Sequence, residues 1–356
     1  MKTEVMQVNR DEQAAASELA WGAAEFARQR ELMDSPMEDY LRTRTKLKYE
    51  ALYFPMGYPV SLRSNSTEVL AAAKQSWGCF EQTFDDKPLE VLMEVRAGQD
   101  GGAILPPAPG HMLLDEMLLE IADADNFFVA DLRAGRALGR VTPAAAGCWP
   151  YLRYFFLEAA ALCMIASMRA VAIHGACVRA GGKGVLLCGD SGEGKSTLAY
   201  AGTRAGWTYV SDDATYVPIH REDRLVIGNC QQIRFRPSCV ALFPELAGYS
   251  ITPRAAGKPS IEIRTSEWTD FSTSNTTQID HVVFLTRRHA DTEELIRLRP
   301  SSVLPWFEQH LLAGRGIRSA QEATIARLLG GGVLELRYRD LGWAINRINE
   351  LAEKGE

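Results

Sequence analysis

A run of glycines around one lysine marks the residues in this chain whose types and spacing suit phosphate chemistry. Residues 189–197 read GDSGEGKST and satisfy the pattern G-x-x-x-x-G-K-[ST] in full. The glycines allow the backbone to curl so that successive N–H groups point at phosphate oxygens, and a following helix adds the positive end of its dipole. Such a loop predicts that Lys195 reaches the β- and γ-phosphates of ATP and that the Ser196 hydroxyl binds Mg²⁺.

The sequence on either side of this loop supports nucleotide binding. By residue usage alone, a chain of this length would contain the pattern with odds of about one in a hundred. The apolar segment before it is typical of a buried strand, and the segment after it is typical of a helix that ends at Gly206. A glycine-rich turn with a surface lysine is the less favoured alternative. The residues predicted to bind the nucleotide are Gly189, Ser191, Gly192, Glu193, Gly194, Lys195, Ser196 and Thr197.

Two adjacent carboxylates follow at the end of the next apolar strand. Asp212 and Asp213 close the segment WTYVS (207–211). Because ligands of open α/β sheets lie beyond the carboxyl ends of the strands, both side chains are expected to face the phosphates. One carboxylate can hold Mg²⁺, directly or through water, and the other can orient an attacking hydroxyl and accept its proton. The alternative is a capped turn after a strand, where Asp is common.

A histidine upstream of the loop is a further candidate. His174 lies in the apolar segment AIHGACV (172–178). This segment is expected to form a strand beside the one that feeds the loop, and Gly175 permits a close backbone approach. His174 is therefore expected to contact phosphate or to take part in catalysis, with a satisfied core histidine as the alternative.

Basic residues downstream of the acids have two interpretations each. Arg234 and Arg236 can clamp a phosphate or a carboxylate of the acceptor, or they can belong to a solvated strand face, and both interpretations stay open. Arg254 and Lys258 can close over the site as part of a lid. Solvated surface charges are the favoured interpretation of this second pair.

The elements that must position these residues alternate between strands and helices in the second half of the chain. Continuous apolar strands in such an alternation favour an α/β core with a buried, largely parallel sheet. Residues 247–279 are rich in Ser, Thr, Gly and Pro and are interpreted as a long mobile loop with a short strand at 260–264. Strands are predicted at 281–288 and 294–299, and helices at 301–312, 319–329 and 340–352.

The first half of the chain predicts a separate α+β domain. We expect domains at 1–147 and 148–356, the first with a role in substrate choice or assembly. A strongly apolar helix over 148–170 is expected to pack between the two halves. The other predicted elements are an amphipathic helix at 11–34, extended runs at 45–63, a helix capped by Ser66 or Thr67, and strands at 89–95 and within 117–132.

Composition narrows the class of protein. The chain has 356 residues, of which 46% are hydrophobic and 24% are charged, which is ordinary globular composition. Its formal charge is −6, so no general attraction to nucleic acid or to an anionic membrane is predicted. The seven cysteines are scattered without a CxxC pair, which favours reduced thiols. The first residues lack the apolar core of a signal peptide, and the longest apolar run is too short to span a bilayer, so a cytoplasmic protein is expected.

Three short motifs in this order resemble those of one known family. The segments IHG (173–175), GDSGEGKST (189–197) and VSDD (210–213) are similar to the HPr kinase/phosphorylase superfamily of bacterial protein kinases. The resemblance is close over about 170–217. It implies a P-loop kinase core of the HPr kinase and phosphoenolpyruvate carboxykinase type with a mixed sheet. It also implies ATP- and Mg²⁺-dependent phosphorylation of a hydroxyl, usually that of a serine.

The resemblance also implies roles for particular residues. His174, Lys195 and Asp213 fall on the catalytic positions, with Asp213 as the base, while Ser196 and Asp212 fall on the metal side. Thr197 stands where HPr kinases usually carry an acid. The chain therefore looks more like the divergent HPr-kinase-related proteins, whose acceptor can be a protein, a peptide or a small molecule. Relatives assemble into rings, so a homo-oligomer is left open.

Three functions compete on these grounds. The first is a Mg-ATP-dependent kinase that transfers the γ-phosphoryl group to a serine-type hydroxyl, and it accounts for both the loop and the acid pair. The second is a non-catalytic ATP-binding sensor, which needs the loop but not the two acids. The third is an ATPase that drives a partner. This last function would need a strand that ends in an acid, whereas the strand at 281–288 ends in arginines.

Overall fold

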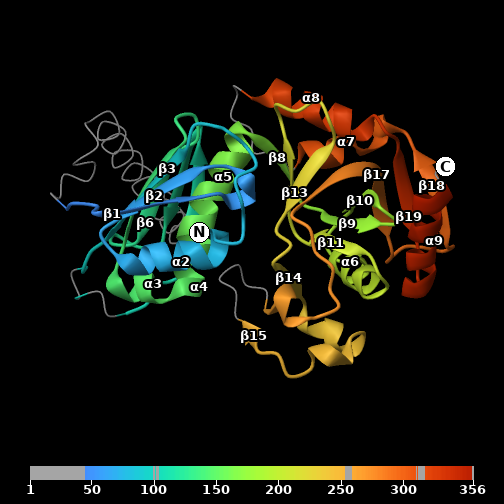
Figure 1. Cartoon of the computed structure of the whole chain (residues 1–356), viewed down its shortest axis with the longest axis horizontal. Helices are drawn as coiled ribbons and strands as arrows, with labels where there is room; N and C mark the ends of the chain where they lie inside the picture. The colour runs from blue at the N-terminus through green and yellow to red at the C-terminus, as the bar shows by residue number, and fades with distance from the viewer. Residues whose placement is uncertain are drawn as a thin grey trace, which may run out of the picture.

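The protein is described here from a computed structural model, which covers residues 45–98, 101, 104–252, 259–309, 311 and 317–354. Within these residues the chain forms two lobes side by side (Figure 1). The first lobe comprises residues 45–168 and the second lobe residues 170–354. Both combine sheets with helices, which confirms the α/β class. The predicted helix at 11–34 and the pair Arg254 and Lys258 lie outside the described residues.

The first lobe is built on a mixed sheet. Over the described residues the sheet has seven strands in the order β1-β2-β3-β7-β6-β5-β4. Strand β3 pairs in parallel with β2 and β7, and the other neighbours are antiparallel. The prediction for 89–95 is confirmed, and 117–132 holds two strands rather than one. The bounds are β1 Tyr49–Tyr53, β2 Val60–Ser64, β3 Leu89–Val95, β4 Gly110–Leu114, β5 Met117–Ile121, β6 Phe127–Asp131 and β7 Arg136–Val141.

Helices cover one face of this sheet. Helix α2 (Thr67–Trp77) begins after Ser66, whose hydroxyl accepts a hydrogen bond from the Glu68 N–H at 3.3 Å, which confirms the predicted cap. The short helix α3 (Pro143–Gly147) follows the sheet. The apolar segment then forms α4 (Trp149–Leu152), a π-helical turn η2 (Arg153–Glu158) and α5 (Ala159–Met168).

This apolar segment packs between the lobes, as predicted. Its side chains form one buried cluster with the sheet of the first lobe and with Ala170, Tyr216 and Ile227 of the second lobe. Among the described helices, the stretch Trp149–Met168 alone is long and apolar enough to cross a membrane, but 61% of it is buried inside the protein. Such burial is typical of the core helix of a soluble protein. The domain boundary at 147/148 stays a prediction.

The second lobe is a three-layer arrangement around a larger mixed sheet. Within the described residues this sheet has nine strands, in the order β11-β9-β10-β17-β13-β12-β8, with β19 beside β17 and β18 beside β19. The bounds are β8 Ala170–Ile173, β9 Ala176–Ala180, β10 Lys183–Cys188, β11 Thr208–Ser211, β12 Thr215–Pro218, β13 Leu225–Gly228, β17 Thr276–Thr286, β18 Glu294–Leu298 and β19 Val333–Arg337.

Helices cover both faces of the second sheet, so its central strands are apolar on both sides. On β10, Val185 and Leu187 pack toward α6 (Lys195–Arg204) and α9 (Leu341–Lys354). The alternate residues Leu186 and Cys188 pack toward α7 (Pro300–Glu308) and α8 (Arg318–Leu329). The predictions for β18 and for these four helices are confirmed within a few residues.

Two expectations about the second sheet are wrong. The sheet is not largely parallel, because only the pairs β10–β17 and β17–β19 of the described sheet are parallel. The loop Gly181–Gly182 has positive φ at both residues, as a tight hairpin requires, and forces β9 and β10 to run antiparallel. The segment 172–178 is not one strand either, since it breaks at His174 and Gly175 between β8 and β9.

The segment interpreted as a long loop contains ordered strands. A three-stranded sheet, counted over the described residues, forms from β14 (Gln232–Phe235), β16 (Ser260–Arg264) and β15 (Ile251–Thr252). The expected short strand at 260–264 is thus confirmed, but β17 starts at Thr276, inside the predicted loop. Apolar residues of β14 and β16 pack over Tyr200 of α6, which explains why this small sheet is ordered.

Glu120 of β5 gives a stability prediction. Its side chain is buried, and burial raises its pKa to about 7. Because the folded pKa exceeds the ordinary value of 4.5, the protonated form is favoured in the folded state, and stability falls as pH rises through about 7. We expect Glu120→Gln to raise the free energy of unfolding by about 1–3 kcal/mol at pH 8, and by less than about 1 kcal/mol at pH 5.

Urea unfolding at the two pH values measures this difference. The matched control is Glu116→Gln, which makes the same chemical change in the turn before β5. If Glu120→Gln changes the free energy of unfolding equally at pH 5 and pH 8, the charge of the buried Glu120 carboxylate is not what destabilises the protein.

Candidate functional site

The glycine-rich segment forms the turn between a buried strand and a helix, as predicted. Strand β10 ends at Cys188 and helix α6 begins at Lys195. Gly189 has a φ of 131° and Gly194 a φ of 95°, both in the region that favours glycine. A Cβ atom on Gly189 would lie 2.9 Å from the backbone oxygen of Leu285. Both the curl of the loop and its close approach to β17 therefore require glycine.

Contacts from distant parts of the second lobe hold the loop. The Glu193 carboxylate accepts hydrogen bonds from the backbone N–H of Arg287 at 2.6 Å and of Arg288 at 3.2 Å. The Tyr338 hydroxyl donates to the backbone oxygen of Glu193 at 3.1 Å. The Glu193 side chain thus anchors the loop to the end of β17. Because the Glu193 carboxylate is occupied by these contacts, only the backbone of Glu193 is left for the nucleotide binding that the sequence predicts.

Two further side chains of the loop have partners on its rim. The Ser191 hydroxyl accepts a hydrogen bond from the Arg236 guanidinium at 3.3 Å. The Asp190 carboxylate accepts one from the indole N–H of Trp306 at 3.2 Å. Arg236 therefore reaches the loop, which is what a phosphate clamp requires and a purely solvated strand face does not.

The Lys195 ammonium lies inside the curl of the loop. Its Nζ donates to the backbone oxygens of Gly189 at 2.7 Å and Asp190 at 3.2 Å, and the residue is buried. Burial lowers the pKa of Lys195, while the neighbouring Cys188 and Asp213 oppose the shift. A cation held by two neutral carbonyl oxygens can exchange these partners for phosphate oxygens.

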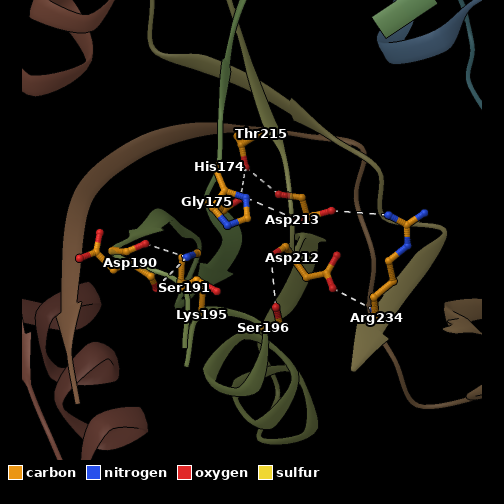
Figure 2. Close-up of polar contacts among 12 residues, drawn as sticks. His174, Gly175, Asp190, Ser191, Lys195, Ser196, Asp212, Asp213, Thr215 and Arg234 are labelled. Carbon is orange, nitrogen blue, oxygen red and sulfur yellow. Dashed lines mark hydrogen bonds and ion pairs between the residues drawn. The ribbon is translucent and has the colours of Figure 1, made fainter. Parts of the chain in front are cut away.

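The acid pair follows β11 directly and meets the start of α6. The Ser196 hydroxyl donates to the backbone oxygen of Asp212 at 3.3 Å (Figure 2). The Asp212 carboxylate is buried and accepts a hydrogen bond from the backbone N–H of Arg234 at 2.9 Å. Burial, and then the charge of Asp213, raise the pKa of Asp212 to about 6. The two residues predicted on the metal side are therefore neighbours.

Asp213 lies between a histidine and an arginine, with half of its side chain exposed. One carboxylate oxygen is 3.4 Å from His174 Nδ1, and the other is 3.5 Å from Arg234 Nη1 (Figure 2). Burial alone would lower the pKa of the Arg234 guanidinium, yet it is raised because carboxylates surround the group. These carboxylates are Glu262, Asp212, Asp213 and Glu158.

His174 occupies the break between β8 and β9 rather than the interior of a strand. The Thr215 hydroxyl donates to the backbone oxygen of Gly175 at 3.0 Å, which ties this break to β12 beside the acids. His174 nevertheless precedes β9, which pairs with β10, so the expected neighbourhood is confirmed. The structure thus brings His174, Lys195, Ser196, Asp212 and Asp213 together, and Thr197 follows in the first turn of α6.

Sequence reasoning missed several residues of this site. The sequence leaves two interpretations of Arg234 open, and the structure places this residue in contact with both acids. Tyr338, Trp306 and the backbone of Arg287 were not singled out, because no local pattern relates them to a loop distant in the sequence. Glu158, which also lies near Arg234, belongs to the apolar segment 148–170 and is not singled out by any local pattern.

The oxygen donors at the start of α6 suit a magnesium ion. In the part of the chain that the structure describes, no three His, Cys, Asp or Glu side chains gather as a metal cage. Mg²⁺ does not need one, because it usually binds through one or two protein oxygens together with water and substrate phosphates. The Ser196 hydroxyl offers one such oxygen at the start of α6, and the carboxyl group of the neighbouring Asp212, which accepts a hydrogen bond from the Arg234 N–H, offers another.

Comparison with known proteins adds no argument about the fold or the site. No protein-family model matches the chain, and no curated protein matches it. Among solved structures, the chain is similar to the Hpr(Ser) kinase/phosphatase from Coxiella burnetii, with 14% sequence identity and a TM-score of 0.28. The match covers 52% of this chain and 99% of that chain. A likeness at this level leaves the site to be interpreted from its own residues.

Proposed function

We propose that this protein is a Mg-ATP-dependent kinase of the HPr kinase-like type, which transfers the γ-phosphoryl group to a serine-type hydroxyl of a protein, a peptide or a small molecule. One observation carries the proposal. Asp213, held by His174 and Arg234, follows the residue whose backbone oxygen binds Ser196 at the end of the glycine-rich loop. A candidate base and a candidate phosphate cradle thus share one site.

Each residue then has a role in the transfer. Lys195 and the backbone N–H groups of the loop bind the outer phosphates, and Ser196 and Asp212 hold Mg²⁺, which neutralises charge on the phosphates when bound. Asp213 orients the acceptor hydroxyl and takes its proton, while the acceptor oxygen bonds to the γ-phosphorus and the bond to the ADP oxygen breaks. The products are a phosphate monoester and ADP, and the proton leaves Asp213 to water.

His174 and Arg234 are positioning residues in this proposal. Each contacts one oxygen of the Asp213 carboxylate, so together they fix its orientation. Such orientation matters because a general base must lie within hydrogen-bond reach of the proton that it abstracts.

Calorimetry and a transfer assay on the intact protein test the proposal. We expect heat of binding from Mg-ATP, and transfer of labelled γ-phosphoryl to at least one member of a pool of serine, ethanolamine, glycerol and seryl peptides. Binding without transfer or hydrolysis would favour the ATP-binding sensor instead. Absence of binding by folded protein would contradict both functions.

The setting of the protein is part of the proposal. A cytoplasmic location is consistent with the seven free thiols at the cysteines. We propose no nucleic acid or membrane partner. Light scattering in solution distinguishes a monomer from a homo-oligomer.

A further inference from the structure

A cavity of about 110 Å³ lies between the two lobes, and the acid pair forms part of its wall. Met56, Glu158 and Leu162 contribute the wall from the first lobe. Asp213, Tyr216 and Arg234 belong to the wall from the second lobe. The proposed base therefore faces a partly open cavity to whose wall both lobes contribute.

The first-lobe wall contains unusual backbone at two points. Met56 has a φ of 51° within the turn Pro55–Gly57, although methionine disfavours positive φ. The turn is held because the Gly57 oxygen accepts hydrogen bonds from the backbone N–H of Thr83 at 3.0 Å and of Phe84 at 3.1 Å. Glu158 is the last residue of the π-helical turn η2, a feature frequent at functional sites.

The charges around the cavity are unequal. The Arg234 guanidinium is 3.5 Å from Asp213 and 3.4 Å from Glu262, so it is already matched by carboxylates. Glu158 is 3.3 Å from Arg153 and accepts a hydrogen bond from the Ser76 hydroxyl at 2.6 Å. Among the residues that line the cavity, the three carboxylates of Glu158, Asp212 and Asp213 outnumber the single guanidinium group of Arg234. This excess of negative charge attracts a cation and repels a second anion.

The cavity is partly open to solvent, and its volume sets how large a part of an acceptor can enter it. It is smaller than the ~150 Å³ cavity that accommodates a benzene molecule, so a group of about four or five heavy atoms fits. Met56 and Leu162 offer apolar contacts to the carbon atoms of such a group, while Glu158 and Asp213 offer acceptors. A hydroxyl near a positive charge satisfies both carboxylates.

The geometry points to this inter-lobe cavity as the acceptor site, and to an acceptor whose hydroxyl is carried on a small cationic group. This inference rests on the proposed function and names its substrate class. Asp213 receives the hydroxyl, and Glu158 binds the positive charge. A free amino alcohol and a seryl residue between basic residues share this chemistry, whereas hydroxy acids and seryl residues between acidic residues do not.

Phosphorylation of matched probes tests the inference. The small probes are ethanolamine, glycerol and glycerate, and the peptide probes are acetyl-Lys-Ser-Lys-amide and acetyl-Glu-Ser-Glu-amide. We expect kcat/KM for the cationic member of each set to exceed that for the anionic member by about tenfold or more. A cationic preference among the small probes identifies a free amino alcohol as the acceptor, and one among the peptides identifies a seryl residue between basic residues. Preference for an anionic probe, or phosphorylation of no probe by protein that binds Mg-ATP, would overturn the inference.

Variants of the first-lobe wall separate the cavity from the nucleotide site. Glu158→Gln keeps an acceptor for Ser76, and we expect it to raise KM for the best cationic probe by about tenfold with little change in kcat. Leu162→Trp fills the cavity and is expected to lower transfer by about tenfold or more, whereas Leu162→Met conserves volume and retains it. Leu113→Trp, on an exposed position of β4, is the matched surface control.

Nucleotide binding distinguishes two kinds of failure. All of these variants should bind Mg-ATP within about twofold of the wild-type protein, because none contacts the loop. Unchanged KM in Glu158→Gln together with unchanged transfer in Leu162→Trp would overturn the acceptor site alone. A wild-type protein that binds no Mg-ATP would instead contradict the proposed function.

Discussion

Asp213→Asn is expected to lower the rate of phosphoryl transfer by about 10²–10⁴-fold, the usual contribution of a general base. The amide can still accept a hydrogen bond from His174, but it cannot take up the proton of the acceptor hydroxyl. Affinity for Mg-ATP should stay within about threefold, because the Asp213 carboxylate contacts His174 and Arg234 and half of its side chain is exposed. Single-turnover transfer to the best acceptor, with calorimetry of Mg-ATP binding, measures the two effects separately.

The control for this variant is a partly exposed aspartate away from the loop. Asp223 pairs with Arg221 and accepts a hydrogen bond from Gln278, so Asp223→Asn removes a comparable surface ion pair. It should transfer phosphoryl groups at the wild-type rate. Full transfer activity in Asp213→Asn would show that Asp213 is not the general base.

Lys195→Met is expected to weaken Mg-ATP binding and to lower transfer, each by about 10²–10³-fold. The ammonium is buried inside the loop and bonded to the oxygens of Gly189 and Asp190, so it is the positive charge best placed to meet phosphate oxygens there. Methionine has a similar length and no charge. Calorimetry with Mg-ATP and the transfer assay report the loss, and circular dichroism verifies the fold.

Strand β10 supplies a matched control for this second variant. Lys183 begins the strand and pairs with Asp280 at 3.0 Å, whereas Lys195 follows its other end. Lys183→Met removes one lysine charge from the same strand–loop unit and should bind Mg-ATP as the wild-type protein does. Wild-type affinity in Lys195→Met would show that this lysine does not hold phosphate.

The local units of the site could be predicted from sequence because their signals are local. The loop between β10 and α6 follows from glycine spacing, and Asp212 and Asp213 follow from an apolar strand that ends in polar residues. Their expected proximity rests on a general property of α/β sheets, and the contact between Ser196 and Asp212 is in accord with it.

The rest could not be predicted because it depends on contacts between distant segments. The strand order of the second sheet depends on the antiparallel hairpin at Gly181–Gly182 and on the pairing of β13 with β17. The two adjacent glycines are a local signal for this hairpin, and the sequence analysis did not use it. Arg234 lies on β14, and the pairing of this strand with β16, from the segment interpreted as a long loop, depends on contacts between distant residues. The approach of Glu158 to Arg234 requires the arrangement of both lobes, for which a single sequence holds no direct signal.

The apolar cluster that joins the lobes has a consequence for how the protein is made. Tyr216 and Ile227 are buried among side chains of the first half of the chain. A fragment that ends near residue 147, or one that begins near residue 148, would therefore expose apolar surface that is buried in the intact protein. The polypeptide is therefore expected to melt as one cooperative entity, and severed fragments should regain solubility only when they are produced together.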